Sequence, residues 1–194
     1  MRQLSKSAEI AIGLCILAGA VHAASPTTAP LRAGAVFPEF SGQTLTGKSL
    51  TLPVAAADRP AVLVFSFSRA AAKDARLWNE HMARDFPNTI AAYGVVVLES
   101  APRVFRGLAI SGMKSSMPIS AQGRTIVLYQ DEELWKQRLA VTDERRAYVL
   151  VLAPSGTVYW TNSGAFSNAM YARLKNRLQK LSPRARSPAA KVSP

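Results

Sequence analysis

The side chains that usually carry out covalent and metal chemistry are scarce in this sequence. The only cysteine, Cys15, lies in an N-terminal apolar run that we expect to be removed, so the mature chain has no thiol nucleophile, redox pair or zinc thiolate. His81 is then the only histidine, and a lone histidine completes neither a zinc site nor a catalytic triad. The acidic run 131–133 begins a predicted helix, where it complements the helix dipole. We therefore expect no catalytic residue, metal or cofactor.

One segment remains where polar side chains could act together, Ser66–Asp74. It follows a buried apolar strand and enters a helix, so backbone N–H groups and the positive end of the helix dipole meet there. Arg69 and Lys73 add positive charge, which favours a small anion or an acidic peptide. A plainer interpretation stays open, in which Ser68 only caps the helix and both cations are solvated. A non-thiol enzyme using Ser68, Arg69 and Asp74 is a further alternative, although no general base is evident near Ser68.

Short apolar runs indicate the strands that position this loop. A hairpin is expected over residues 34–52, with its turn at Thr46-Gly47-Lys48. Further strands are predicted at 61–65, 90–98, 125–129, 148–152 and 157–161. The last two form a second hairpin through the turn at 154–156. Strands that alternate with helices indicate the α/β class, with a central mixed sheet, flanking helices and an N-terminal hairpin.

The helices are indicated by apolar residues that recur every three or four positions. The first helix has one apolar face: Ala71, Ala75, Trp78, Met82 and Phe86. The second is expected to be lined by Val104, Phe105 and Leu108 and to end near Gly112. A short third helix covers about residues 131–139. The last helix repeats apolar residues every four positions: Phe166, Met170, Leu174 and Leu178.

Composition separates the ends of the chain from the domain. A basic start, an apolar run from Ile10 to Ala20 and acceptable cleavage-site residues at Val21 and Ala23 predict a secretory signal peptide, with an uncleaved anchor as the alternative. The chain divides into signal peptide, linker, domain and disordered basic tail: residues 1–23, 24–32, 33–182 and 183–194. The protein is expected to be exported to the periplasm or the exterior, and a peripheral position at the membrane stays open.

The positive charge is concentrated at the C-terminal end. The formal net charge is +12, and Glu144 is the last acidic residue. The predicted basic surface comprises Arg173, Lys175, Arg177, Lys180, Arg184 and Arg186. Outside the cytoplasm such a surface suits a protein partner with an acidic face or an anionic membrane rather than nucleic acid, while a merely solvated helix face stays open. Trp160 is a second candidate for partner contact, since either it or Tyr159 faces outward if the strand alternates.

The order of the elements and three motifs resemble the thioredoxin-like superfamily, especially its exported TlpA/ResA and peroxiredoxin-like branch. Phe37-Pro38-Glu39-Phe40 followed by Leu45-Thr46-Gly47-Lys48 is similar to the opening hairpin of that branch. The strand and helix of residues 61–78 and the hairpin of residues 149–159 complete the resemblance, which spans most of residues 33–182. It implies a thioredoxin-like fold.

The departures from this resemblance bear on function. It implies a C-x-x-C pair near residues 71–74, where this chain has Ala-Ala-Lys-Asp, and a cis-proline near Ala147. Both halves of the redox site are missing, so no thiol oxidoreductase or peroxidase activity is expected. The resemblance implies a redox-inactive member that binds or helps to assemble other proteins in the cell envelope. The chain is also similar to the assembly factors of mitochondrial ATP synthase.

Overall fold

The computed structural model describes residues 29–56 and 59–181. The predicted signal peptide, the start of the linker and the basic tail with Arg184 and Arg186 lie outside the described residues. Leu31, in the predicted linker, donates its backbone N–H to the Arg138 carbonyl at 2.7 Å and packs on the core. The folded domain therefore begins slightly before residue 33.

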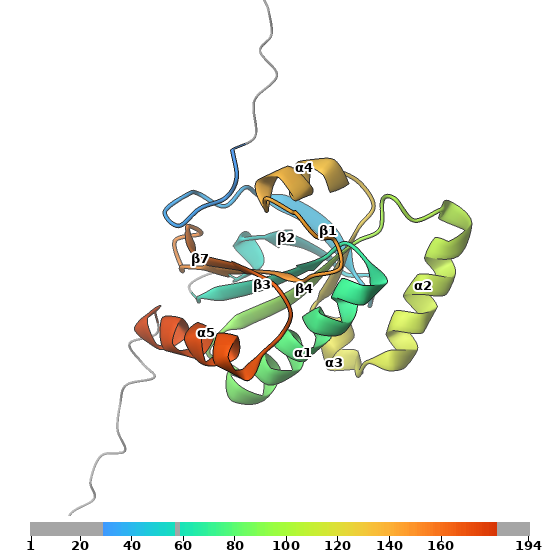
Figure 1. Ribbon diagram of the computed structural model, residues 1–194. Helices are drawn as coiled ribbons and strands as arrows, with labels where there is room; N and C mark the ends of the chain where they lie inside the picture. Colours follow the sequence, from blue (N-terminus) through green and yellow to red (C-terminus); the bar gives the residue numbers. More distant parts are fainter. Residues whose placement is uncertain (1–28, 57–58, 182–194) are drawn as a thin grey trace, which may run out of the picture.

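A mixed seven-stranded sheet in the order β2-β1-β5-β4-β3-β6-β7 forms the centre of the protein (Figure 1). The strands are β1 (Phe40–Thr44), β2 (Ser49–Leu52), β3 (Ala61–Ser66), β4 (Ala91–Val97), β5 (Thr125–Leu128), β6 (Tyr148–Leu152) and β7 (Val158–Ser163). The helices are α1 (Arg69–Asp85), α2 (Arg103–Ser116), α3 (Ile119–Gln122), α4 (Glu132–Arg138) and α5 (Asn168–Leu181), with a 3-10 turn η1 (Val54–Ala56). The predicted α/β class, mixed sheet and N-terminal hairpin are confirmed.

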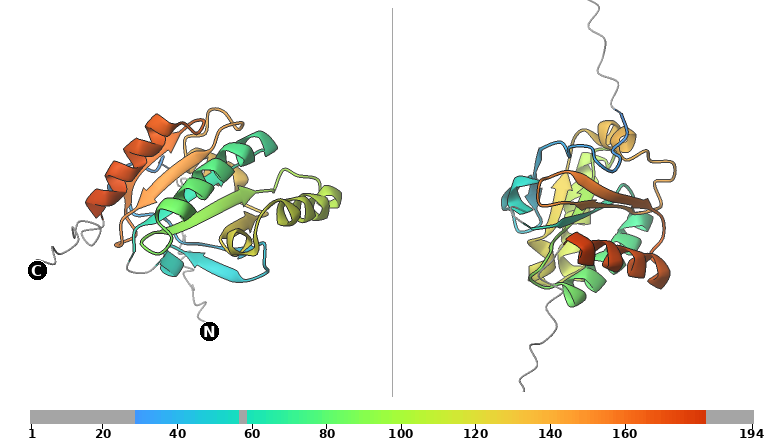
Figure 2. Two further views of the ribbon diagram at one scale, coloured as in Figure 1. Left: turned by 90° about the horizontal axis from the view of Figure 1, so that it is seen from below. Right: turned by 90° about the vertical axis from the view of Figure 1, so that its left-hand side faces the viewer.

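The central strand β3 is buried along its whole length. It pairs in parallel with β4 and antiparallel with β6. Its alternation sends Leu63 and Phe65 to one core and Val62 and Val64 to the other. Helix α4 covers the first core, whereas α1 and α5 lie side by side over the second (Figure 2).

The first core contains a cluster of aromatic rings. The Phe40 and Trp135 ring centroids are 4.9 Å apart, and those of Phe65 and Trp135 are 5.0 Å apart. Phe37 stacks on Trp135 with a centroid separation of 5.9 Å. The N-terminal segment and α4 are thus held against β3 by apolar burial, which is a large favourable term for aromatic side chains.

The second core joins α1 to α5. The predicted inward face of α1 is confirmed at Ala71, Ala75, Trp78 and Met82, which are all buried. Tyr171 of α5 is buried against this face, and its hydroxyl lies 2.8 Å from the His81 carbonyl oxygen. The His81 ring packs on Phe166, with centroids 4.5 Å apart, so the histidine lies at the boundary of the core.

The prediction for α2 is wrong in two respects. The helix continues through Gly112 to Ser116, and Val104, Phe105 and Leu108 are not inward but 81%, 60% and 72% exposed. The reason is Arg106, whose guanidinium donates to the carbonyls of Glu99 and Ala101 at 2.6 and 2.9 Å. These bonds turn the side bearing Arg106 toward the domain and leave the apolar residues facing water.

Candidate functional site

The junction of β3 and α1 is held by the Ser68 hydroxyl. Ser68 has an extended backbone, and its Oγ accepts the Ala71 N–H at 3.1 Å, so the predicted helix cap is confirmed. The same hydroxyl donates to the Glu144 carbonyl oxygen at 2.7 Å. Ser68 therefore ties the start of α1 to the loop that precedes β6, which is the loop where the resemblance implied a cis-proline.

That loop, residues 142–147, is braced from within. The Tyr148 hydroxyl oxygen accepts the N–H groups of Thr142 and Asp143 at 3.0 and 3.2 Å. The Asp143 carboxylate accepts the backbone N–H of Arg145 and pairs with the Arg145 and Arg146 guanidinium groups. The backbone N–H and the guanidinium of Arg145 hold the pKa of Asp143 below its usual range.

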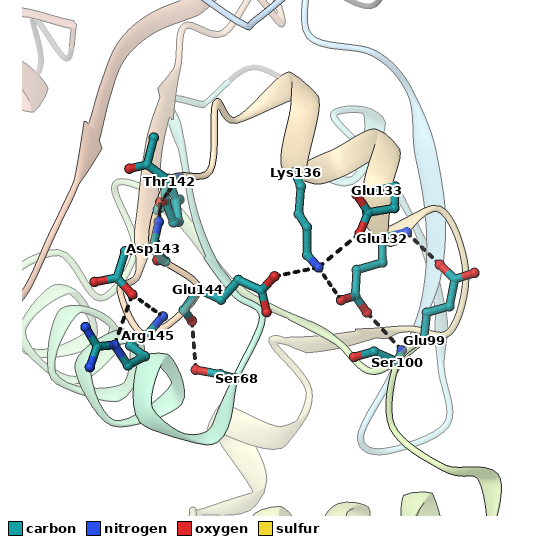
Figure 3. Close-up of polar contacts among 11 residues, drawn as sticks. Ser68, Glu99, Ser100, Glu132, Glu133, Lys136, Thr142, Asp143, Glu144 and Arg145 are labelled. Carbon is teal, nitrogen blue, oxygen red and sulfur yellow. Dashed lines mark hydrogen bonds and ion pairs between the residues drawn. The ribbon is translucent and has the colours of Figure 1, made fainter.

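Lys136 of α4 forms the centre of an ion-pair cluster beside this loop (Figure 3). Its Nζ lies 2.8 Å from Glu132, 3.1 Å from Glu133 and 2.7 Å from Glu144. Hydrogen bonds to Glu132 and Glu144 raise the pKa of Lys136 above its usual value. We name Lys136, Glu132, Glu133 and Glu144 the Lys136 cluster.

Glu132 connects the Lys136 cluster to the β4–α2 segment. Its carboxylate, buried with α4, accepts the Ser100 N–H at 2.9 Å, and the Glu99 carboxylate accepts the Glu132 N–H at 2.6 Å. Burial favours the neutral acid, but the bonds from Lys136 and Ser100 outweigh it and lower the pKa of Glu132. The cluster therefore joins helix α4, the loop 142–147 and the β4–α2 segment at one end of the sheet. Its charged groups pair with one another.

The candidate residues of the loop 66–74 occupy different environments. Ser66 is buried at the end of β3, whereas Arg69 and Lys73 are exposed on α1. Asp74 is half-buried and accepts the Phe166 N–H at 3.4 Å. Ser68 thus bonds the backbone of Glu144, and Asp74 bonds the backbone of Phe166. Arg69 and Lys73 instead place their positive charge in solvent.

The place implied for the first cysteine of the redox pair and the place implied for the cis-proline are both occupied by alanine, while the place of the second cysteine is occupied by Asp74. Ala71 and Ala147 are both fully buried. Ala71 belongs to the inward face of α1, and Ala147 precedes β6 in the second core. The two alanine positions contribute packing and no polar chemistry.

Trp160 does not project from the sheet as expected. A register shift between Val151 and Leu152 leaves Tyr159 in a bulge on β7. Tyr159 and Trp160 consequently both pack, partly buried, against the second core. The expectation that one of the two faces outward required unbroken alternation, and the bulge removes that condition. A role of Trp160 in partner contact stays a prediction.

The basic surface on α5 is narrower than predicted. Tyr171, Leu174 and Leu178 face the core, so the exposed positively charged residues lie opposite: Arg173, Arg177 and Lys180. Lys175 lies at the edge of the buried face, with its side chain 40% exposed, and its Nζ lies 3.0 Å from Asp85 Oδ2. Hydrogen bonds from Arg84 and Lys175 hold the pKa of Asp85 well below its usual range.

The described residues place no group of three or more histidine, cysteine or carboxylate side chains for a metal ion. None of the helices within residues 29–56 and 59–181 is long and apolar enough to cross a membrane. Two shallow hollows of about 190 and 300 Å³ lie between α2 and the β1–β2 turn and between α1 and α5. Both are away from the β3–α1 junction.

Comparison with known proteins confirms the fold. No protein-family model matches the chain, and no curated protein matches it in sequence. Among solved structures, it is similar to a protein named as the thiol:disulfide interchange protein DsbE from Chlorobium tepidum, with a TM-score of 0.58, 13% identity and coverage of 78% of this chain and 98% of that one. It is also similar to a thiol:disulfide interchange protein of Chlorobium tepidum TLS, described as a thioredoxin family protein. The TM-score is 0.51 and the identity 17%, and the match covers 79% of this chain and 99% of that one.

A third similar structure is BsSco, a member of the Sco family of cytochrome c oxidase assembly proteins, with a TM-score of 0.53, 11% identity and coverage of 77% and 96%. At such identities the shared feature is the fold. The chain therefore has a thioredoxin-like fold, as its motifs indicated. The similarity to ATP-synthase assembly factors stays a prediction.

Proposed function

We propose that this protein is an exported, redox-inactive protein of thioredoxin-like fold that acts as a binding or assembly factor in the cell envelope. The observation that carries the proposal is the β3–α1 junction. Ala71 is buried in the core there, Ser68 is bonded to Glu144, and residues 24–194 contain no cysteine. A junction without a thiol and with its hydroxyl engaged suits binding better than group transfer.

The exported location rests on the N-terminal sequence of residues 1–23. The fold is compatible with an assembly role, because BsSco shares it. Helices α1 and α5 lie on the same side of the sheet (Figure 2). Their exposed cations are Arg69 and Lys73 on α1 and Arg173, Arg177 and Lys180 on α5. We infer that this side receives an acidic protein face.

The alternative of a non-thiol enzyme or small-anion site in the loop 66–74 is less well supported. The Ser68 hydroxyl would have to leave the Glu144 carbonyl to act as a nucleophile, and Asp74 holds the Phe166 N–H instead of orienting a base. A thermal-shift screen with the purified protein would favour this alternative if one small anion stabilised it specifically.

Site-specific photocrosslinking tests the binding role. A photoreactive residue at Lys73, in the tagged protein expressed in its own envelope, should capture one partner that mass spectrometry identifies in stoichiometric amount. The same residue at Ser49, which is exposed on the edge strand β2, is the matched control and should capture none. Arg69→Glu combined with Arg173→Glu, in the protein that carries the photoreactive residue at position 73, should abolish the crosslink. Equal capture from Ser49 and Lys73, or none from either, would reject this docking surface.

A further inference from the structure

Helix α2 presents an apolar face that nothing in the described residues covers. Val104, Phe105 and Leu108 are exposed, and Ile119 at the start of α3 is 77% exposed. No residue of α2, all of which the structure describes, is fully buried. The side toward the domain consists of half-buried residues: Arg106, Ala109, Ile110 and Met113. The helix therefore places Val104, Phe105 and Leu108 where they meet solvent rather than the core.

The charged side chains within residues 100–130, the stretch that holds α2, all have one sign, and the exposed carboxylates of Glu99 and Asp131 lie just beyond its two ends. Residues 100–130 contain Arg103, Arg106, Lys114 and Arg124 and no acidic residue. Arg106 is engaged with two backbone carbonyls and lies over the Tyr129 ring, whereas the other three are exposed. At 100° per residue, Arg103 and Lys114 project within about 20° of each other, beside the arc that carries Val104 and Leu108. An occupant of this face must be apolar and anionic at once.

A second copy of the chain does not meet that requirement. Pairing two α2 helices would bring Arg103 and Lys114 of one copy near the same cations of the other, in a chain of net charge +12. An anionic membrane surface meets both requirements, because its phosphates attract the cations and its acyl chains accept the apolar side chains.

We infer that α2 is an interfacial helix that docks on anionic phospholipid, with Val104, Phe105 and Leu108 inserted among the acyl chains and Arg103, Lys114 and Arg124 at the phosphates. The inference uses a different surface from the proposed protein docking side on α1 and α5. Either can therefore fail without the other.

Sedimentation with vesicles is the first test. The mature protein should bind vesicles that contain phosphatidylglycerol and not vesicles of phosphatidylcholine alone. Phe105→Ser with Leu108→Ser should lower the partition coefficient at least about tenfold, since two large apolar side chains are removed from the contact. The matched control is Val36→Ser with Val54→Ser, which removes two other exposed apolar side chains and should leave binding unchanged.

Charge reversal on α5 separates its contribution to vesicle binding from that of α2. Arg173→Glu, Arg177→Glu and Lys180→Glu should weaken only the salt-sensitive part of binding. If this variant abolished binding while the α2 variant retained it, α5 would be the lipid contact and the inference for α2 would be overturned.

Depth-dependent quenching is the second test. A tryptophan introduced as Phe105→Trp should be quenched by phosphatidylglycerol with brominated acyl chains, whereas Val36→Trp, at another exposed position, should not be. Vesicle binding without quenching at position 105 would leave α2 in water and overturn the inference. Absence of vesicle binding would overturn it too. A single protein crosslinked from position 105 would then assign the face to a protein partner.

Discussion

Replacing Lys136 with methionine should destabilise the protein strongly, because it leaves a buried carboxylate without its cation. The Glu132 side chain is 5% exposed and pairs with Lys136 Nζ at 2.8 Å. Removing one partner of a buried pair costs about 3–5 kcal/mol. The surviving bond from the Ser100 N–H favours the low end, about 3 kcal/mol. For a domain of this size, that corresponds to a fall in melting temperature of about 6–12 °C.

Urea unfolding followed by tryptophan fluorescence measures this cost, and the Lys136 cluster supplies its own control. Glu133 pairs with the same Nζ but is 79% exposed, so Glu133→Gln should cost less than about 0.5 kcal/mol. Adding Glu132→Gln to Lys136→Met should restore part of the loss, since no charge is then left buried.

The pH dependence checks the same reasoning. Without Lys136 the pKa of Glu132 should rise, so the deficit of Lys136→Met should shrink as the pH falls below about 5 and Glu132 takes up a proton. A Lys136→Met variant as stable as Glu133→Gln at neutral pH would refute the anchoring role of the cluster.

Two further predictions concern the same end of the sheet, and a third concerns the whole domain. Ser68→Ala should lower the free energy of unfolding by about 2 kcal/mol, about 1 for the helix cap and about 1 for the bond to the Glu144 carbonyl, as measured by urea unfolding. Tyr148→Phe should cost about 1–3 kcal/mol, because two N–H groups of the loop 142–147 lose their acceptor, and their hydrogen exchange should accelerate. Acid should destabilise the wild type: the pKa values of Asp85, Asp143 and Glu132 are lowered on folding, so the unfolded chain binds more protons below about pH 5 and stability falls from there. A flat stability profile from pH 5 to 2 would contradict this.

The parts of the fold that depend on local sequence were predictable. The continuous apolar run 61–65 became a strand buried on both faces, and the spacing of Ala71, Ala75, Trp78 and Met82 gave the inward side of α1. The cap at Ser68 was also predictable, since an N-cap depends on residues three positions apart. Each of these features is decided by neighbours within one element.

The site depends on contacts between distant segments, and these left little trace in the sequence. Glu132 and Lys136 have the spacing of a helical ion pair, which could have signalled half of the Lys136 cluster. The sequence shows nothing that brings Glu144 to Lys136, or its carbonyl to Ser68, 76 positions away. The bulge opposite Val151, which turns Tyr159 and Trp160 to the same core, is likewise set by strand register.

Helix α2 shows why periodicity alone misjudges a surface helix. An apolar arc on a helix indicates a face that packs against something. It does not show whether the covering surface belongs to the same chain. In α1 the cover is α5 and the sheet, so the interpretation as core is correct. In α2 the bonds of Arg106 hold the opposite side against the domain, and Val104, Phe105 and Leu108 face outward among cations. The absence of acidic residues from 100 to 130 was visible in the sequence, whereas α1 carries Asp74, Glu80 and Asp85. A single charge sign does not decide the matter alone, because α5 carries only positive charges and still buries Tyr171, Leu174 and Leu178. In α2 the single sign counts because it accompanies apolar side chains that the described residues leave exposed.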